Sequence, residues 1–241
     1  MRSTALLGAA LLAIVMVAPA TAQSTDIDLK TSDGVTLKAT YTSPGRPGPA
    51  MLLIHQCNMD RSSWSDISTQ LVDAGIHVLT MDLRGFGDSG GEGISGGFPQ
   101  LLQKSAGDLD MAYAYLVSQT GVDGSRVGVG GASCGAMLTS DLAARQSGIT
   151  TLMLLSGPPG EAAAAHIMAT PGLAVFGAAA EDDSVIADVA ANIKKAVDGS
   201  KNPHSMAKVV TGTEHGLPMF DKHPTLEPEL VSWLKTQLLS N

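Results

Sequence analysis

Ser133, which lies between Gly131 and Gly135, is the residue of this chain whose surroundings indicate chemistry most clearly. A short apolar run at residues 126–130 precedes it, and residues 134–145 after it have the composition of a helix. A Gly-x-Ser-x-Gly sequence between a strand and a helix is typical of a sharp turn that lifts the serine hydroxyl above the edge of a sheet. The two glycines allow the close packing that this turn requires. Ser133 is therefore the predicted nucleophile of an acyl-transfer reaction.

A serine hydroxyl is a weak nucleophile and needs a histidine base that a carboxylate orients. In this architecture the acid and then the histidine follow the serine along the chain. His215 lies in the loop directly after the late strand that is expected at 207–211 and has a glycine beside it, and Glu181, Asp182 and Asp183 follow the strand before that one. We predict Ser133, Asp182 and His215 as the catalytic residues, with Asp183 and then Glu181 as the alternatives for the acid.

The tetrahedral intermediate of acyl transfer also needs two hydrogen-bond donors for its negatively charged oxygen. The backbone N–H of Cys134, which begins the helix after Ser133, is the first expected donor. The second is expected from the loop after the apolar run at residues 50–54, where Cys57 is preferred and Gln56 is the alternative.

The segments that position these residues alternate between apolar runs and helices. Apolar and polar residues alternate on both sides of Gly34, which predicts an antiparallel hairpin, and the later runs have the composition of buried parallel strands. The sequence thus predicts an α/β fold with a mostly parallel central sheet, an N-terminal antiparallel hairpin, helices on both faces and no large cap domain. Strands are expected at 27–30, 35–41, 50–54, 76–81, 126–130, 151–155, 173–177 and 207–211, and helices at 62–74, 101–118, 134–145, 185–197 and 226–239.

Together these motifs resemble the α/β-hydrolase superfamily over nearly the whole chain from residue 23 onwards. The short chain and the missing cap are most similar to its lidless branch of dienelactone-hydrolase-like proteins and small serine esterases. The loop after the second parallel strand resembles a wall of the superfamily's active site, and Asp82 and Arg84 are expected to pair there. True dienelactone hydrolases place a cysteine at the position of Ser133, so the resemblance does not imply a dienelactone substrate.

The loop that carries the second expected oxyanion donor departs from the pattern of the superfamily. His55 and Gln56 stand where His-Gly is commoner, and His55 is expected to brace the loop. In the superfamily this loop touches the nucleophile turn, and the two cysteines of the chain, Cys57 and Cys134, lie on these two segments. Our hypothesis is that they form a disulfide that fixes the loop and stabilises the fold by roughly 4 kcal/mol. Two buried free thiols are the alternative.

The N-terminus has the pattern of a secretory signal peptide at residues 1–22. Arg2 precedes a short apolar run, and small residues stand at Ala20 and Ala22. We expect cleavage to leave residues 23–241 as a single domain in the periplasm or outside the cell, without a stable membrane anchor. An uncleaved anchor is the alternative, although the apolar run is short for one.

Composition limits the classes of partner. The chain has 241 residues, 44% hydrophobic content, a formal net charge of -8 and no basic run, so we expect one core and no nucleic-acid partner. We expect no cofactor and no metal, and a small-molecule acyl substrate; the sequence does not indicate the oligomeric state. The predicted activity is hydrolysis of carboxylic esters or related acyl compounds through an acyl-serine intermediate. A peptidase or amidase, a thioesterase, an acyltransferase and an inactive binding protein with this fold are the alternatives.

Overall fold

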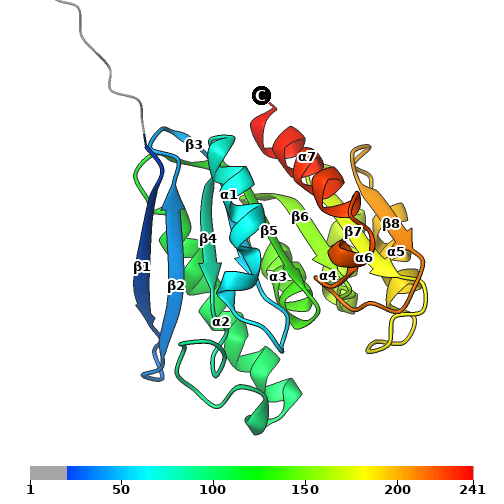
Figure 1. Ribbon diagram of the computed structural model, residues 1–241, viewed down its shortest axis with the longest axis horizontal. Coiled ribbons are helices and arrows are strands. Elements are labelled where there is room, and N and C mark those ends of the chain that lie inside the picture. The colour runs from blue at the N-terminus through cyan, green and yellow to red at the C-terminus, as the bar shows by residue number, and fades with distance from the viewer. Residues whose placement is uncertain (1–20, 241) are drawn as a thin grey trace, which may run out of the picture.

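The computed structural model describes residues 21–240, so all but the last two residues of the predicted signal peptide lie outside the described part of the chain. The described residues form one sheet with helices on both faces (Figure 1). Its strands are β1 (Gln23–Lys30), β2 (Thr36–Ser43), β3 (Gly48–Ile54), β4 (His77–Met81), β5 (Val122–Ala132), β6 (Ile149–Leu155), β7 (Ala174–Ala180) and β8 (Met206–Val210). The helices are α1 (Ser65–Asp73), α2 (Phe98–Val117), α3 (Cys134–Arg145), α4 (Glu161–Ala169), α5 (Val189–Asp198), α6 (Met219–Lys222) and α7 (Leu226–Leu239), with short 3-10 helices η1 (Arg61–Trp64) and η2 (Gly93–Gly96).

The strand order across the sheet is β1-β2-β4-β3-β5-β6-β7-β8. β2 pairs antiparallel with both β1 and β4, whereas every other neighbouring pair is parallel. Between β6 and β7 the described chain holds only α4, so no cap domain covers the sheet. The predicted fold class is confirmed. Because parallel strands end on the same edge, the loops after β3, β5, β7 and β8 can meet there.

The side chains of β3 show why its sequence is a continuous apolar run. Leu52 and Ile54 pack in the core on the face covered by α2, α3, α4 and α5, and Met51 and Leu53 pack on the face covered by α1 and α7. Figure 1 shows α1 and α7 in front of the sheet and α2 and α3 behind it. A strand that is buried on both faces has no polar side to alternate with.

Helix α5 begins later than the predicted range of residues 185–197. The backbone N–H groups of Val185 and Ile186 donate hydrogen bonds to Oδ1 of Asp183, at 2.9 and 3.0 Å. These two bonds close a local turn at residues 183–186, and the helix itself begins only at Val189. The turn therefore occupies the segment where apolar periodicity predicted the first residues of a helix.

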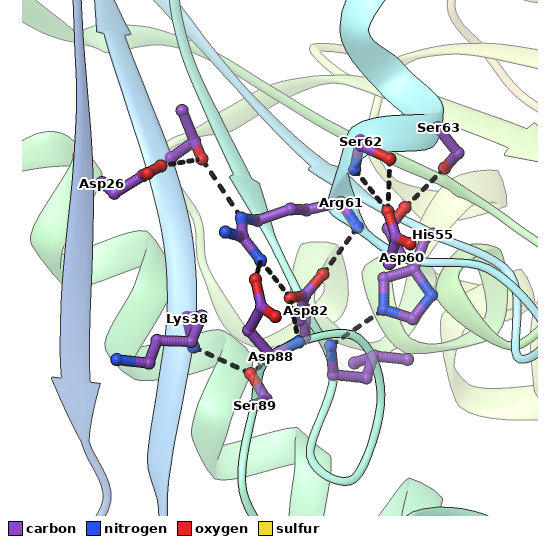
Figure 2. Close-up of polar contacts among 12 residues, drawn as sticks. Asp26, Lys38, His55, Asp60, Arg61, Ser62, Ser63, Asp82, Asp88 and Ser89 are labelled. Atoms are coloured by element: carbon purple, nitrogen blue, oxygen red, sulfur yellow. Dashed lines mark hydrogen bonds and ion pairs between the residues drawn. The ribbon is translucent and has the colours of Figure 1, made fainter.

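The loop after β4 corrects the expected pairing of Asp82 with Arg84. Arg84 instead forms a bidentate ion pair with Asp108 of α2, in which both N–O distances are 2.7 Å. Asp82 is buried beside η1, where it pairs with Arg61 and accepts the N–H of Asp88 at 2.9 Å (Figure 2). Because η1 and α2 lie on opposite faces of the sheet, the two neighbouring side chains enter different layers of the fold.

We expect Arg84→Ala to lower the free energy of unfolding by about 3 to 5 kcal/mol, because it leaves the carboxylate of Asp108 buried without its cation. The side chains of this pair are only 6% and 3% exposed. Arg145→Ala is the matched control, since Arg145 and Asp110 form an ion pair in which each side chain is 37% exposed. Such a pair contributes about 1 kcal/mol or less. Urea unfolding of both variants tests this, and equal losses would contradict it.

Candidate active site

Ser133 occupies a strained turn between β5 and α3. Its φ of 53° and ψ of -122° lie outside the regions that residues other than glycine usually adopt, at a cost of about 1 to 3 kcal/mol. Its N–H donates to the carbonyl of Leu155 at 2.7 Å, and its own carbonyl accepts the N–H of Met137 at 3.1 Å. A side chain at Gly157, which the sequence analysis did not single out, would collide with that carbonyl. Backbone contacts on both sides thus hold the serine at the edge of the sheet.

The two glycines beside Ser133 are required because the end of β3 packs against the turn. A Cβ atom at Gly131 would lie 2.7 Å from the carbonyl oxygen of Ile54, and one at Gly135 would lie 2.5 Å from that of His55. Both distances are far too short for non-bonded atoms, so the chain cannot carry a side chain at either position without moving. The residues that follow Ile54 are thereby held next to the nucleophile turn.

The structure brings Asp183, and not the preferred Asp182, to His215. Nδ1 of His215 lies 2.9 and 2.8 Å from the two carboxylate oxygens of Asp183. The Asp183 side chain is 1% exposed, and that of His215 is 10% exposed. Asp182 is exposed, and its backbone N–H donates to the carbonyl of Gly212 in the histidine loop. The prediction therefore requires a correction by one residue, because the turn after β7 directs only the second aspartate inward.

The carboxylate of Asp183 is ionised at neutral pH. Burial raises its pKa, but the hydrogen bonds from the N–H groups of Ile186 and Val185 and from His215 outweigh burial, so that the pKa lies below its usual value. An ionised partner accepts a hydrogen bond from the Nδ1–H group of His215, which leaves Nε2 as the unprotonated nitrogen of the neutral imidazole. Nε2 is buried, and no group in residues 21–240 forms a hydrogen bond with it.

The histidine loop lies against both the nucleophile turn and the loop after β3. A Cβ atom at Gly216 would lie 3.6 Å from Cβ of Ala132, the residue before the serine. The N–H of Leu217 donates to the side-chain oxygen of Gln56 at 3.0 Å. The imidazole of His215 is thus held in a loop that contacts the strand leading to Ser133.

Cys57 and Cys134 form a disulfide with a Cα–Cα distance of 5.9 Å. Cys134 is the first residue of α3, so its N–H has no partner within the helix. The N–H of Cys57 also has no acceptor among residues 21–240. The bridge therefore connects the two backbone amides that the sequence analysis preferred as oxyanion donors. The side chain of Gln56, the alternative donor, accepts a hydrogen bond from the histidine loop.

The loop after β3 is also fixed to the loop after β4. Nε2 of His55, which is labelled in Figure 2, accepts the N–H of Leu83 at 2.9 Å. Its Nδ1 lies 2.8 Å from the carbonyl oxygen of Gln56. Burial lowers the pKa of His55, which keeps it neutral and able to accept this bond. Farther along, the N–H of Arg61 donates to Asp82 at 2.6 Å. His55 therefore braces the loop and has no free nitrogen for proton transfer.

In the part of the chain that the structure describes, no three His, Cys, Asp or Glu side chains are grouped closely enough to hold a metal ion. None of the helices in that part is both long and apolar enough to cross a membrane.

Solved structures with this fold include two esterases. An esterase of Pyrococcus furiosus is 17% identical, with a TM-score of 0.70, and the alignment covers 90% of this chain and 91% of that one. A cold-adapted esterase from an Arctic intertidal metagenomic library is 18% identical, with a TM-score of 0.69 and coverage of 90% and 94%. At this level of identity the similarity concerns the fold alone.

Sequence comparison identifies both relatives and a family. An uncharacterised protein of Mycobacterium tuberculosis, found in two strains, is 31% identical over 123 residues, which are 50% of this chain but only 41% of the relative. A family model described as serine aminopeptidase, S33, matches residues 45–211, a range that contains Ser133 and Asp183. This chain therefore belongs to the serine aminopeptidase S33 family of hydrolases, within the α/β-hydrolase superfamily.

Proposed function

We propose that this protein is an exported serine hydrolase that cleaves carboxylic esters or related acyl compounds. One observation carries the proposal: His215 binds the buried carboxylate of Asp183 through Nδ1, while Nε2 is buried and has no partner among the described residues. A histidine with one nitrogen oriented and the other unengaged is suited to act as a general base. The strained turn at Ser133, against which the histidine loop packs, supplies the nucleophile.

In the acylation step, the oxygen of Ser133 attacks the acyl carbon of the substrate, and its proton passes to Nε2 of His215. Asp183 stabilises the imidazolium that forms. The negative charge on the substrate oxygen is stabilised by the N–H groups of Cys134 and Cys57. When the tetrahedral intermediate collapses, the leaving group departs with the proton from His215, and the acyl group remains on the serine.

Water then reverses the same sequence of steps. His215 takes a proton from the water molecule, whose oxygen attacks the acyl carbon of the ester on Ser133. The carboxylic acid is released, and the proton returns from His215 to the serine oxygen. No redox step and no group other than water is needed to complete the cycle.

Labelling with a fluorophosphonate probe tests the proposal on residues 23–241. We expect the wild type to be labelled, mass spectrometry to place the label on Ser133, and Ser133→Ala to abolish both labelling and ester hydrolysis. Ser140→Ala is the matched control, because Ser140 lies on α3, the helix that follows Ser133, and its hydroxyl donates a hydrogen bond to the carbonyl of Met137. A folded wild-type protein that resists labelling and hydrolyses no ester would favour an inactive binding protein.

A second candidate, cleavage of peptides or other amides, is favoured by the description of the matching family as a serine aminopeptidase. The same residues can perform it, because acylation of a serine by an ester or an amide differs mainly in the leaving group. A matched series of p-nitrophenyl esters, thioesters and aminoacyl p-nitroanilides distinguishes the candidates. We expect the ratio of kcat/KM to the uncatalysed rate, which corrects for the higher intrinsic reactivity of esters, to be highest for the esters. A higher ratio for the anilides would assign the peptidase activity instead.

Export is the part of the proposal that rests on residues 1–22. The basic residue, the apolar run and the small residues before Gln23 support cleavage and transport across a membrane. N-terminal sequencing of the protein recovered from the periplasm or the medium would test it, with Gln23 as the expected first residue. Recovery of the whole chain with Met1 from the cytosol would overturn it.

A further inference from the structure

Gln56 is a buried polar side chain that links two loops of the candidate site. Only 3% of the residue is exposed, and its Oε1 accepts the N–H of Leu217, which is 161 residues away in the sequence, at 3.0 Å. Its Nε2 donates to the side-chain oxygen of Asn58 at 2.8 Å, which sets the orientation of the amide. One side chain thus connects the loop that carries His215 to the loop that carries Cys57.

Gly216 shows how closely Gln56 approaches the histidine loop. A Cβ atom at this position would collide with Oε1 of Gln56 and lie 3.0 Å from its Cδ. Its φ of 71° is also a conformation that glycine adopts most easily. The glycine beside His215 therefore makes room for the amide of Gln56 as well as permitting the turn.

The backbone of Gln56 fixes the other loop. Its carbonyl accepts the N–H groups of Asn58 at 2.8 Å and of Met59 at 3.0 Å, and it lies 2.8 Å from Nδ1 of His55. These bonds form a turn with Cys57 at its bend. That carbonyl and the side chain belong to one residue, so Gln56 links the histidine loop to the turn that holds the amide of Cys57.

We propose that Gln56 is a positioning residue, which holds His215 and the amide of Cys57 in a fixed relation to each other. The inference rests on the proposed function, in which the imidazole and the oxyanion donors act in the same transition state. A glycine at position 56, as in the commoner His-Gly sequence, would leave the N–H of Leu217 without this acceptor. It would also create an empty space beside Gly216. The glutamine is thus this chain's own means of keeping the two loops together.

The test compares Gln56→Met, which keeps the length of the side chain but removes the acceptor, with the wild type in hydrolysis of p-nitrophenyl butyrate. We expect kcat to fall between about tenfold and about a hundredfold, with KM changed by less than about twofold, because reacting groups that are displaced by a fraction of an ångström lose rate more than affinity. Gln56→Glu, which keeps an oxygen acceptor in either protonation state, is expected to retain most of the activity.

Gln70→Met is the matched control. Gln70 also makes a hydrogen bond between distant segments, to Glu227 at 2.8 Å, but it lies between α1 and α7, away from the site. We expect it to leave kcat unchanged. Three results would overturn the inference. Gln70→Met could lose as much kcat as Gln56→Met, or Gln56→Glu could lose as much as Gln56→Met. A folded Gln56→Met protein with the wild-type kcat would also overturn it.

A second measurement is independent of turnover. The proton that His215 shares with Asp183 gives a proton NMR resonance far downfield, and we expect Gln56→Met to shift or broaden it while Gln70→Met leaves it unchanged. An unchanged resonance in Gln56→Met would overturn the positioning role. If the wild type neither hydrolyses esters nor reacts with the fluorophosphonate probe, the proposed function fails, and this resonance still decides whether Gln56 positions His215.

Discussion

Replacing Asp183 with asparagine is expected to lower kcat by about 10⁴-fold. Oδ1 of Asp183 accepts hydrogen bonds from the N–H groups of Val185 and Ile186. The amide oxygen of the asparagine would occupy the position of Oδ1 and accept the same two bonds. The amide nitrogen would then face Nδ1 of His215 and force the proton onto Nε2, the atom that must accept the proton of Ser133. The variant would thus fold with its histidine in the wrong tautomer.

Asp182→Asn is the matched control for this prediction, because the two aspartates are adjacent and only Asp183 contacts His215. We expect its kcat to stay within about twofold of the wild type, since an exposed surface substitution has little effect. Steady-state kinetics of both variants on one ester substrate decides whether Asp183 or Asp182 is the catalytic acid. The reverse pattern, with Asp182→Asn inactive and Asp183→Asn active, would restore the acid that the sequence analysis preferred.

Asp183 also links stability to pH. Its pKa in the folded protein lies below its value of 3.8 in the unfolded chain, so the ionised carboxylate stabilises the fold. The contribution is complete above the unfolded pKa and is lost as the pH falls through the folded pKa. We therefore expect the difference in unfolding free energy between wild type and Asp183→Asn to be larger at about pH 7 than at about pH 2. A difference that grows in acid would contradict this assignment.

Removing the disulfide is expected to lower both the stability of the fold and the rate of hydrolysis. The bridge joins residues 77 positions apart, and in the chain-entropy model its loss in Cys57→Ala/Cys134→Ala lowers the free energy of unfolding by about 4 kcal/mol. Loss of the bridge also allows the two amides proposed as oxyanion donors to move. We therefore expect kcat to fall by up to about 10²-fold, which is the cost of one displaced donor. Urea unfolding and kinetics, both well below the melting temperature, measure the two effects.

Treatment of the wild type with a reducing agent supplies the control for this variant. The reductant should reproduce both losses in the wild type and change nothing in Cys57→Ala/Cys134→Ala. Reduced wild-type protein that keeps its full kcat would show that the bridge stabilises the fold without holding the oxyanion donors. Under the proposed export, the enzyme would reach full activity only in an oxidising compartment.

Short-range patterns were enough to predict the fold. The alternating residues around Gly34 indicate strands that are buried on one face, and the fully apolar runs indicate strands that are buried on both faces. Both patterns involve only residues that are close together in the sequence. Strand ends could likewise be located within a few residues. Ser133 and His215 could therefore be assigned to loops at one edge of the sheet, because parallel strands place their ends together.

The choice between Asp182 and Asp183 could not be made from the sequence. Both aspartates follow β7 directly, and both have the same chemistry. The turn that selects Asp183 depends on where Val185 and Ile186 place their N–H groups, whereas apolar periodicity predicts a helix for those residues. A one-residue error follows from this, because a loop has no period that could define the direction of each side chain.

The sequence by itself determined the order of the strands, the helices other than α4 and α6, and the edge at which the site forms. Only the tertiary structure decided the partners: Asp108 for Arg84, Leu217 for Gln56, and Asp183 for His215. The physical reason is that burial and turn formation depend on neighbouring residues, whereas hydrogen bonds and ion pairs form between whichever groups the packed layers bring within about 3 Å. For Gln56 and Leu217, those groups lie 161 residues apart in the chain.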